Sequence, residues 1–115
     1  KVDVDKLTTK VYGFAGRYRR ITAATVTLVA GNYIIGCSGS SGGSPINQTI
    51  TLPVPNTCLV GTQLLIKDEY KDRGSTKIFV SASSGTKIEN RAFTVMVGTM
   101  PAINLYTDGS NWFIY

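Results

Sequence analysis

The side chains that could carry out chemistry in this chain are few. The sequence contains no His, which removes the commonest general base and the commonest metal ligand. Asp68, Glu69 and Asp72 lie close together, and two carboxylates can hydrolyse a glycosidic bond. Lysine and arginine residues lie beside them, however, so we predict mutually compensated surface charges. Asp108 precedes Gly109 as in a hairpin turn, which gives it a structural role in place of a Ca²⁺ ligand. The sequence therefore predicts a protein that is not an enzyme and needs no metal or cofactor.

If the domain binds a receptor, residues 68–75 are where we expect the contact to lie. Residues 68–75 alone combine an aromatic ring, two cations and carboxylates within one loop. Tyr70 can stack on a sugar ring, while Lys71 and Arg73 can bind its hydroxyl groups or an anionic substituent. Function also tends to sit on loops that a rigid scaffold carries. We predict Tyr70, Lys71 and Arg73 as receptor contacts; the alternative is a loop that is merely solvated.

The one cluster of positive charge is Arg17-Tyr18-Arg19-Arg20. Arginines around an aromatic ring could bind nucleic acid, but four residues are a thin basis, and we do not expect a nucleic-acid partner. Upstream of them, Val4, Leu7, Val11 and Phe14 follow heptad-like spacing over only two heptads. We therefore interpret residues 1–21 as a connector or the end of a shaft, and residues 22–115 as the folded domain.

Composition places the chain among β proteins. Charged residues make up 17%, below the average of about 25% for soluble domains, so an assembly that covers part of the surface is one explanation. The net charge of +5 comes mostly from the first twenty residues. Cys37 and Cys58 could pair, but two cysteines do not make a disulfide framework, and we expect two partly buried free thiols. No run is long enough to span a membrane, and no signal peptide is expected at the N-terminus.

The last fourteen residues, Ala102–Tyr115, predict a β-hairpin around Asp108-Gly109-Ser110-Asn111. A two-residue loop pairs Leu105 with Trp112, and a four-residue loop pairs Leu105 with Ile114. Either loop places the same apolar side chains on one face, where we expect the centre of the core. These predicted core residues are Ile103, Leu105, Trp112 and Ile114. The opposite face carries Tyr106, Phe113 and Tyr115, directed towards a second layer or another subunit.

The remaining segments predict short strands that follow one another quickly. They are separated by turn residues at intervals typical of an all-β sandwich or barrel, and no repeat of solenoid period is present. We predict a β-sandwich, jelly-roll-like, of about nine short strands. Besides the hairpin, the predicted strands are residues 25–29, 33–37, 48–52, 63–67, 77–80 and 93–97, with residues 38–44 as a Ser/Gly loop.

The order of these segments resembles the C-terminal β-module of bacteriophage tail fibres, tailspikes and related virion spike proteins. The resemblance covers about residues 22–115, and its strongest parts are the I-T-L-P, I-K-D-E and Y-T-D-G-S-N-W-F sequences in this order. It departs from the family pattern at residues 70–73, where the family more often has small residues and Gly. The segments that carry it are Gln48–Pro53, Gly61–Glu69, Lys77–Val80, Thr86–Asn90 and Asn104–Ile114.

This resemblance implies a homotrimeric all-β module at the distal end of a phage fibre or spike. Such a module binds a host surface receptor, often a saccharide, for which a polysaccharide is one candidate. Its expected location is the virion, in a tail or capsid appendage, after assembly in the host cytoplasm. The alternative that it implies is a structural trimerisation or folding cap for an upstream shaft or depolymerase domain. The family motif fixes no receptor contacts, so none is carried over to this chain.

Overall fold

The computed structural model describes residues 17–31 and 33–115, and the heptad-like residues of the predicted connector lie outside this range. The described chain is all-β apart from one 3-10 turn at Pro55–Thr57. The strands are β1 (Arg17–Ile21), β2 (Thr25–Thr27), β3 (Tyr33–Cys37), β4 (Ser40–Ser41), β5 (Ser44–Pro45), β6 (Gln48–Thr51), β7 (Gln63–Asp68), β8 (Ile78–Ser81), β9 (Phe93–Met96), β10 (Ala102–Thr107) and β11 (Trp112–Ile114).

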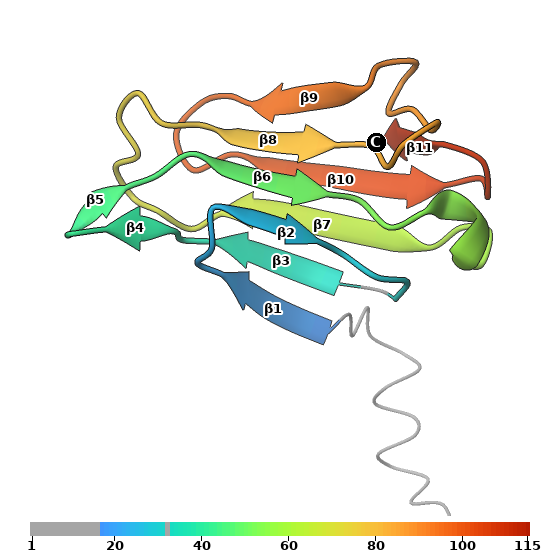
Figure 1. Cartoon of the computed structure of the whole chain (residues 1–115), viewed down its shortest axis with the longest axis horizontal. Helices are drawn as coiled ribbons and strands as arrows, with labels where there is room; N and C mark the ends of the chain where they lie inside the picture. Colours follow the sequence, from blue (N-terminus) through green and yellow to red (C-terminus); the bar gives the residue numbers. More distant parts are fainter. Residues whose placement is uncertain (1–16, 32) are drawn as a thin grey trace, which may run out of the picture.

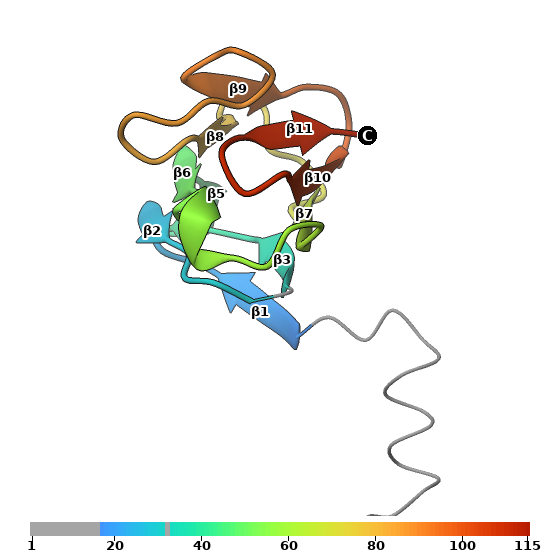
Figure 2. The same ribbon diagram turned by 90° about the vertical axis from the view of Figure 1, so that its right-hand side faces the viewer.

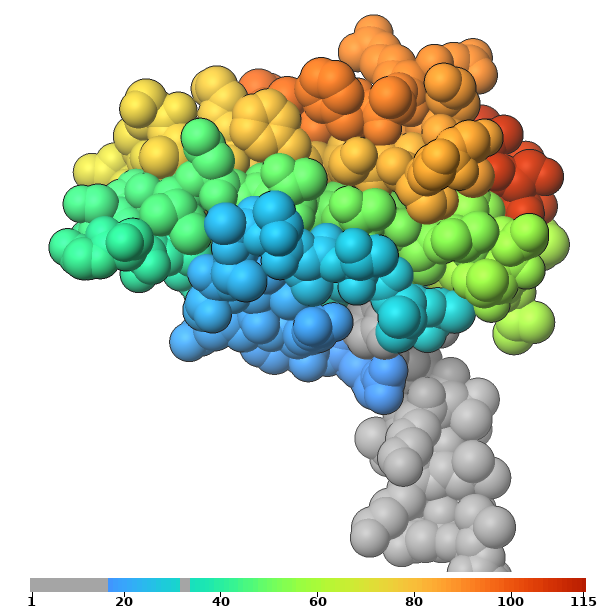
Figure 3. Space-filling model, in the orientation of Figure 1, coloured from blue at the N-terminus to red at the C-terminus, as the bar shows by residue number. Residues whose placement is uncertain are grey.

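Two main sheets face each other as layers. One sheet has five strands in the order β1-β3-β7-β10-β11, and the other has four in the order β2-β6-β8-β9. Figure 1 shows the strands lengthwise, and Figure 2 shows the two layers from one end. The space-filling view shows the four-stranded layer as one face, from β2 in blue through β6 and β8 to β9 in orange (Figure 3). The prediction of an all-β fold is confirmed.

Parallel pairing distinguishes this fold from the predicted jelly roll, whose strands pair antiparallel. The chain alternates between the layers, so that β1, β3 and β7 run parallel in one sheet and β2, β6 and β8 run parallel in the other. Each passage through both layers thus resembles one turn of a flattened coil. The antiparallel strands β9, β10 and β11 complete the sheets at the far edge.

The sequence shows no period because successive turns of the coil have different lengths. Tyr33 pairs with Arg17 in the preceding turn and with Leu64 in the following turn, and the second separation is much the longer. The β4–β5 hairpin and the 3-10 turn take up the additional residues. The segment predicted as a simple Ser/Gly loop therefore contains a small hairpin, in which Ser41 pairs with Ser44.

The core lies between the layers, where alternate residues of each strand point inwards. Trp112 and Leu105 are fully buried, and the indole N–H of Trp112 donates a hydrogen bond of 3.0 Å to the Pro53 carbonyl oxygen. Ile103 is partly buried against the same cluster. Ile114 differs from the prediction, since it is 39% exposed. It shares the inward face, but it ends the short strand β11, which is the edge of its sheet among the described residues.

The closing hairpin uses the four-residue loop of the two alternatives. Leu105 pairs with Ile114, and Thr107 pairs with Trp112. The carboxylate of Asp108 accepts hydrogen bonds of 2.9 Å from the backbone N–H groups of Ser110 and Asn111. These bonds to the charged form lower the pKa of Asp108. Asp108 therefore holds the turn, as its position before a glycine predicted.

The predicted boundary of the domain is wrong. Arg17–Ile21 forms β1, which pairs in parallel with β3 along its whole length, so these residues belong to the five-stranded sheet and not to a connector. Ile21 is buried in the core at 4% exposure. The exposed arginines suggested a connector, but β1 is an edge strand, and charged residues are common on edge strands.

Candidate functional site: a groove between two crossing loops

A polar groove lies where two loops cross from one layer to the other at the same end of the molecule. Residues 69–77 connect β7 to β8, and residues 97–101 connect β9 to β10. The loops are neighbours because Lys67 at the end of β7 pairs with Ala102, and Ile78 at the start of β8 pairs with Met96. The groove between them has a volume of about 340 Å³, within the range of small-molecule sites.

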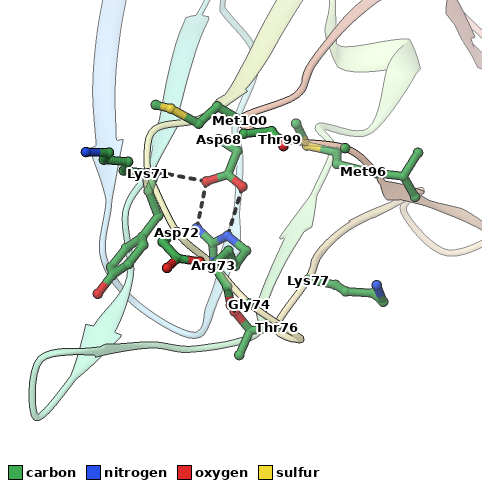
Figure 4. A pocket seen from close by; sticks show the side chains of 13 residues that line it. Asp68, Lys71, Asp72, Arg73, Gly74, Thr76, Lys77, Met96, Thr99 and Met100 are labelled. Atoms are coloured by element: carbon green, nitrogen blue, oxygen red, sulfur yellow. Dashed lines mark hydrogen bonds and ion pairs between the residues drawn. The ribbon is translucent and has the colours of Figure 1, made fainter.

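A buried ion pair forms the floor of the groove. Both N–H groups on one side of the Arg73 guanidinium donate to the Asp68 carboxylate, with Nε–Oδ2 and Nη2–Oδ1 distances of 3.0 Å. The side chains of Arg73 and Asp68 are only 7% and 5% exposed. Two parallel charge-assisted bonds fix the orientation as well as the distance of the pair. The pair therefore ties the start of the 69–77 loop to its middle, as Figure 4 shows.

The same guanidinium also binds earlier turns of the coil. Arg73 donates to the carbonyl oxygen of Ile46 at 2.7 Å, and more weakly, at 3.3 Å, to the carbonyl oxygen of Cys37 and to Oε1 of Gln48. Gln48 is fully buried, and its amide group donates to the carbonyl oxygen of Ile21 at 2.9 Å. Since buried polar networks are costly unless every member is satisfied, this network fixes one arrangement of the loop.

Arg73, which we predicted as a receptor contact, is buried and not exposed on the loop surface. Its donors are used inside the chain, so it positions the groove and is not available on the surface. Tyr70 is half-buried, and its hydroxyl group donates to the Gly43 carbonyl oxygen at 3.1 Å. Its ring lies 5.7 Å from the Arg73 guanidinium carbon, in cation–π contact. Of the three predicted residues, only Lys71 is exposed at the groove.

The second wall of the groove is also held in place. The Lys67 amine donates to the carbonyl oxygen of Met100, and the backbone N–H of Asp68 donates to the Pro101 carbonyl oxygen at 2.9 Å. Met100 has a φ of +47°, in the left-handed region that non-glycine residues rarely adopt. Asp68 thus contacts both walls, through its side chain and through its backbone, and the groove exists before any ligand is bound.

The rim of the groove carries the groups that a ligand can reach. Lys71, Asp72, Lys77 and Thr99 are exposed and come from both walls. Figure 4 shows Lys71 and Lys77 extending to opposite sides of the buried ion pair. The rim therefore offers donors and acceptors at separate points around a neutralised floor, an arrangement suited to the scattered hydroxyl groups of a saccharide.

The groove has no activated nucleophile among its described neighbours. Cys37 lies behind the ion pair, and burial raises the pKa of its thiol to about 12. Cys37 and Cys58 are both free thiols. In residues 17–31 and 33–115, no group of three or more His, Cys, Asp or Glu residues could hold a metal ion. The exposed rim groups can form hydrogen bonds with a polar ligand.

Sequence reasoning missed the second wall. Thr99 lies in the 97–101 loop, and nothing local indicated that β9 would pair with β8 while β10 paired with β7, which brings this loop beside residues 69–77. The available signal was Gly98, which suggested a turn near a polar residue. The predicted segment, residues 68–75, forms one wall of the groove and part of its rim.

Comparison with known proteins gives no family. No protein-family model matches the sequence, and a search of curated proteins found no match. Within the described part of the chain, no helix is long and apolar enough to cross a membrane.

Proposed function

We propose that this chain is a non-enzymatic virion attachment module at the distal end of a phage fibre or spike. It binds a host cell-surface receptor, a polysaccharide in the reading that we favour, through the groove between residues 69–77 and 97–101. It acts as a homotrimer in the tail or capsid appendage of the virion, after assembly in the host cytoplasm. The observation that carries this proposal is the preformed polar groove with an exposed rim.

Three features of the groove support receptor binding. A groove whose walls are already fixed loses little conformational entropy when it binds. Its rim presents Lys71, Asp72 and Thr99, which can donate and accept hydrogen bonds with sugar hydroxyl groups. Finally, the Asp68–Arg73 ion pair is buried, and a buried ion pair often adds no net stability compared with apolar residues. Its role in this loop is therefore to hold one conformation of the groove. The ordered sequence resemblance to phage spike modules agrees with these features.

Competition with virus adsorption tests this function. The 115-residue chain, added to host cells before the virus that encodes it, is expected to reduce adsorption. The double variant Lys71→Ala/Thr99→Ala is expected to need at least tenfold more protein for the same reduction. Lys87→Ala/Thr27→Ala is the matched control, since it removes one exposed lysine and one exposed threonine outside the groove.

The two outcomes that contradict the proposal are separate. If the wild-type chain leaves adsorption unchanged, attachment is not its function. If the groove variant and the control both compete as well as the wild type, the chain binds its receptor elsewhere.

A second candidate function is a trimerisation or folding cap for an upstream shaft or depolymerase domain. The observation that favours it is the aromatic outer face of the five-stranded sheet, which has the character of a subunit contact. A cap is expected to leave virus adsorption unchanged, while its deletion should prevent the upstream polypeptide from assembling.

A further inference from the structure

Strand β9 is the edge of the four-stranded sheet on the side away from β2. Its hydrogen-bonded neighbour in the described part of the chain is β8 alone, and Figures 1 and 2 show it as the outermost strand of its sheet. A hollow of about 490 Å³ runs along the strand, lined by residues 91–95. An open edge exposes backbone N–H and C=O groups, which makes it a template for another strand.

Alternate residues of β9 direct their backbone groups out of the sheet. In an antiparallel pair, residues that exchange both hydrogen bonds with the partner strand alternate with residues that exchange none. The N–H of Ala82 donates to the Ala92 carbonyl oxygen at 2.8 Å, so Ala92 faces β8. By the same alternation Thr94 also faces β8, while Phe93 and Val95 direct their N–H and C=O groups away from it. No strand of the described chain pairs with that side of β9.

Strand β9 also lacks the features that protect sheet edges from pairing. Proteins blunt open edges with charged side chains, with prolines or with very short strands. β1, an edge of the other sheet, has three arginines among its five residues, while β2 and β11 have only three residues each. β9 is Phe-Thr-Val-Met, four residues without a charge or a proline. Of the edges that the structure describes in the two main sheets, β9 is therefore the best suited to accept a strand.

The side chains along the edge indicate which strand fits. Phe93 is 52% exposed on the outer face of the sheet, and its ring centroid lies 6.3 Å from that of Phe79 on β8. Val95 lies opposite Phe79 on the same face. A strand added to β9 would place every second side chain beside Phe93 or Val95. Aromatic and β-branched residues pack best against such neighbours.

A positive charge lies at the start of the edge. Arg91 is exposed and lines the same hollow as Phe93 and Val95. The ion pairs among residues 17–31 and 33–115 join other arginines to carboxylates and do not include Arg91. A carboxylate at the end of an added strand could pair with this guanidinium, so charge complementarity favours an acidic partner.

We infer that β9 is a docking site for an extended peptide segment of another protein. The segment alternates β-branched or aromatic residues with polar ones and carries an Asp or Glu beside Arg91. It exchanges backbone hydrogen bonds with Phe93 and Val95, which supply affinity, while its side chains on the outer face supply specificity. This protein contact goes beyond the proposed function, and it uses none of the exposed rim residues of the groove.

Fluorescence anisotropy with a synthetic peptide tests the contact. The probe is a labelled peptide of alternating valine and threonine that begins and ends with aspartate, and the wild-type chain is expected to bind it saturably. The same peptide with methylated backbone nitrogens keeps the side chains but loses the donors, so it should bind at least tenfold more weakly. A peptide with lysine in place of aspartate should bind about threefold more weakly, as expected for exposed ion pairs. Equal binding of the aspartate and lysine peptides would contradict the role of Arg91.

A proline variant tests whether the edge of β9 is the site. Val95→Pro removes an outward N–H and leaves the bonds to β8, since an edge strand tolerates proline where its N–H faces solvent. It should weaken binding of the probe at least tenfold. Thr27→Pro is the matched control on β2, the opposite edge of the same sheet. Its neighbour Leu28 donates to the Thr51 carbonyl oxygen at 2.9 Å, so the Thr27 N–H faces outwards. This control should bind the probe as the wild type does.

A second variant keeps the test decisive if Val95→Pro does not fold. Phe93→Lys places a charge on an exposed position of the edge and should also weaken binding at least tenfold. Fluorescence from the buried Trp112 reports whether each variant is folded. A wild-type chain without saturable binding up to about 1 mM peptide overturns the inference, as do folded edge variants that bind like the wild type.

One further outcome would assign the edge to a different occupant. If the wild type binds no peptide and Val95→Pro lowers the mass of the free chain in light scattering, a second copy occupies β9 and the inference is wrong. None of these readouts involves host cells or the groove, so a failure of the proposed attachment is seen separately in adsorption.

Discussion

Replacing Arg73 with Met should destabilise the domain strongly, although Arg73 lies in a loop. The variant keeps most of the side-chain length and removes the hydrogen bonds that Arg73 donates to Asp68, Ile46 and Gln48. Asp68 then remains buried at 5% side-chain exposure, and among the described residues its carboxylate keeps only the 2.9 Å bond from the Tyr70 backbone N–H. Removing one partner of a buried pair in this way costs about 3–5 kcal/mol.

That loss is large for a domain of this size. Whole-domain stabilities are about 5–15 kcal/mol, so Arg73→Met removes a substantial share. At roughly 4 °C per kcal/mol for about one hundred residues, the melting temperature should fall by about 12–20 °C. Thermal unfolding followed by far-UV circular dichroism measures this shift.

Two further variants show whether the cause is the ion pair. Lys71→Met changes an exposed lysine of the same loop and should alter stability by less than about 0.5 kcal/mol. Asp68→Leu combined with Arg73→Met leaves no unpaired buried charge, so it should be less destabilised than Arg73→Met alone. If Arg73→Met melts within 3 °C of the wild type, the guanidinium is not anchored as the structure shows and the groove lacks its fixed floor.

Three other perturbations have definite expected results. Gly39→Ala should destabilise the fold by about 1–3 kcal/mol in urea unfolding, because a Cβ there would lie 2.7 Å from Cδ of the buried Gln48; an unchanged unfolding midpoint would contradict this. Trp112→Phe should cost at least about 1–3 kcal/mol, since the buried Pro53 carbonyl oxygen loses its donor; equal melting temperatures would place the indole elsewhere. The lowered pKa of Asp108 contributes stability that is complete above the ordinary value of 3.8 and is lost as the pH falls through the lower folded value. Asp108→Asn should therefore lose less stability than the wild type below pH 4, and parallel acid-unfolding curves would refute this assignment.

The sequence predicted local features of the fold well. The closing hairpin and the inward position of Trp112 followed from side-chain alternation and from the turn chemistry of Asp108 and Gly109. These signals are local, because both strands and the turn lie within fourteen residues. The choice between a two-residue and a four-residue loop needed the pairing of Leu105, which turn residues alone did not determine.

The coil-like strand order could not be predicted from the sequence. Parallel neighbours such as β3 and β7 are separated by a hairpin, a strand of the other sheet and a 3-10 turn, and turns of unequal length leave no repeat. The sequence of β1 suggests a connector because four of its five residues are exposed and only Ile21 is buried. A strand at the edge needs only one apolar contact to be retained in the sheet.

The candidate site was predicted in part for a similar reason. The loop after β7 could be predicted as polar from its residues, but the burial of Arg73 depends on acceptors from β3, the segment before β6, and β6 itself. Burial of an arginine is rare without a carboxylate partner, and Asp68, five residues earlier, was the available signal. The second wall required the pairing of β8 with β9 and of β7 with β10.

A binding isotherm on host cells tests the proposed function most directly. Fluorescently labelled wild-type chain is expected to bind the cells saturably, and unlabelled chain should displace it. Lys71→Ala/Thr99→Ala should bind at least tenfold more weakly, while Lys87→Ala/Thr27→Ala should match the wild type. Wild-type chain that shows no saturable binding, or a groove variant that binds as tightly as the control, would contradict attachment through the groove.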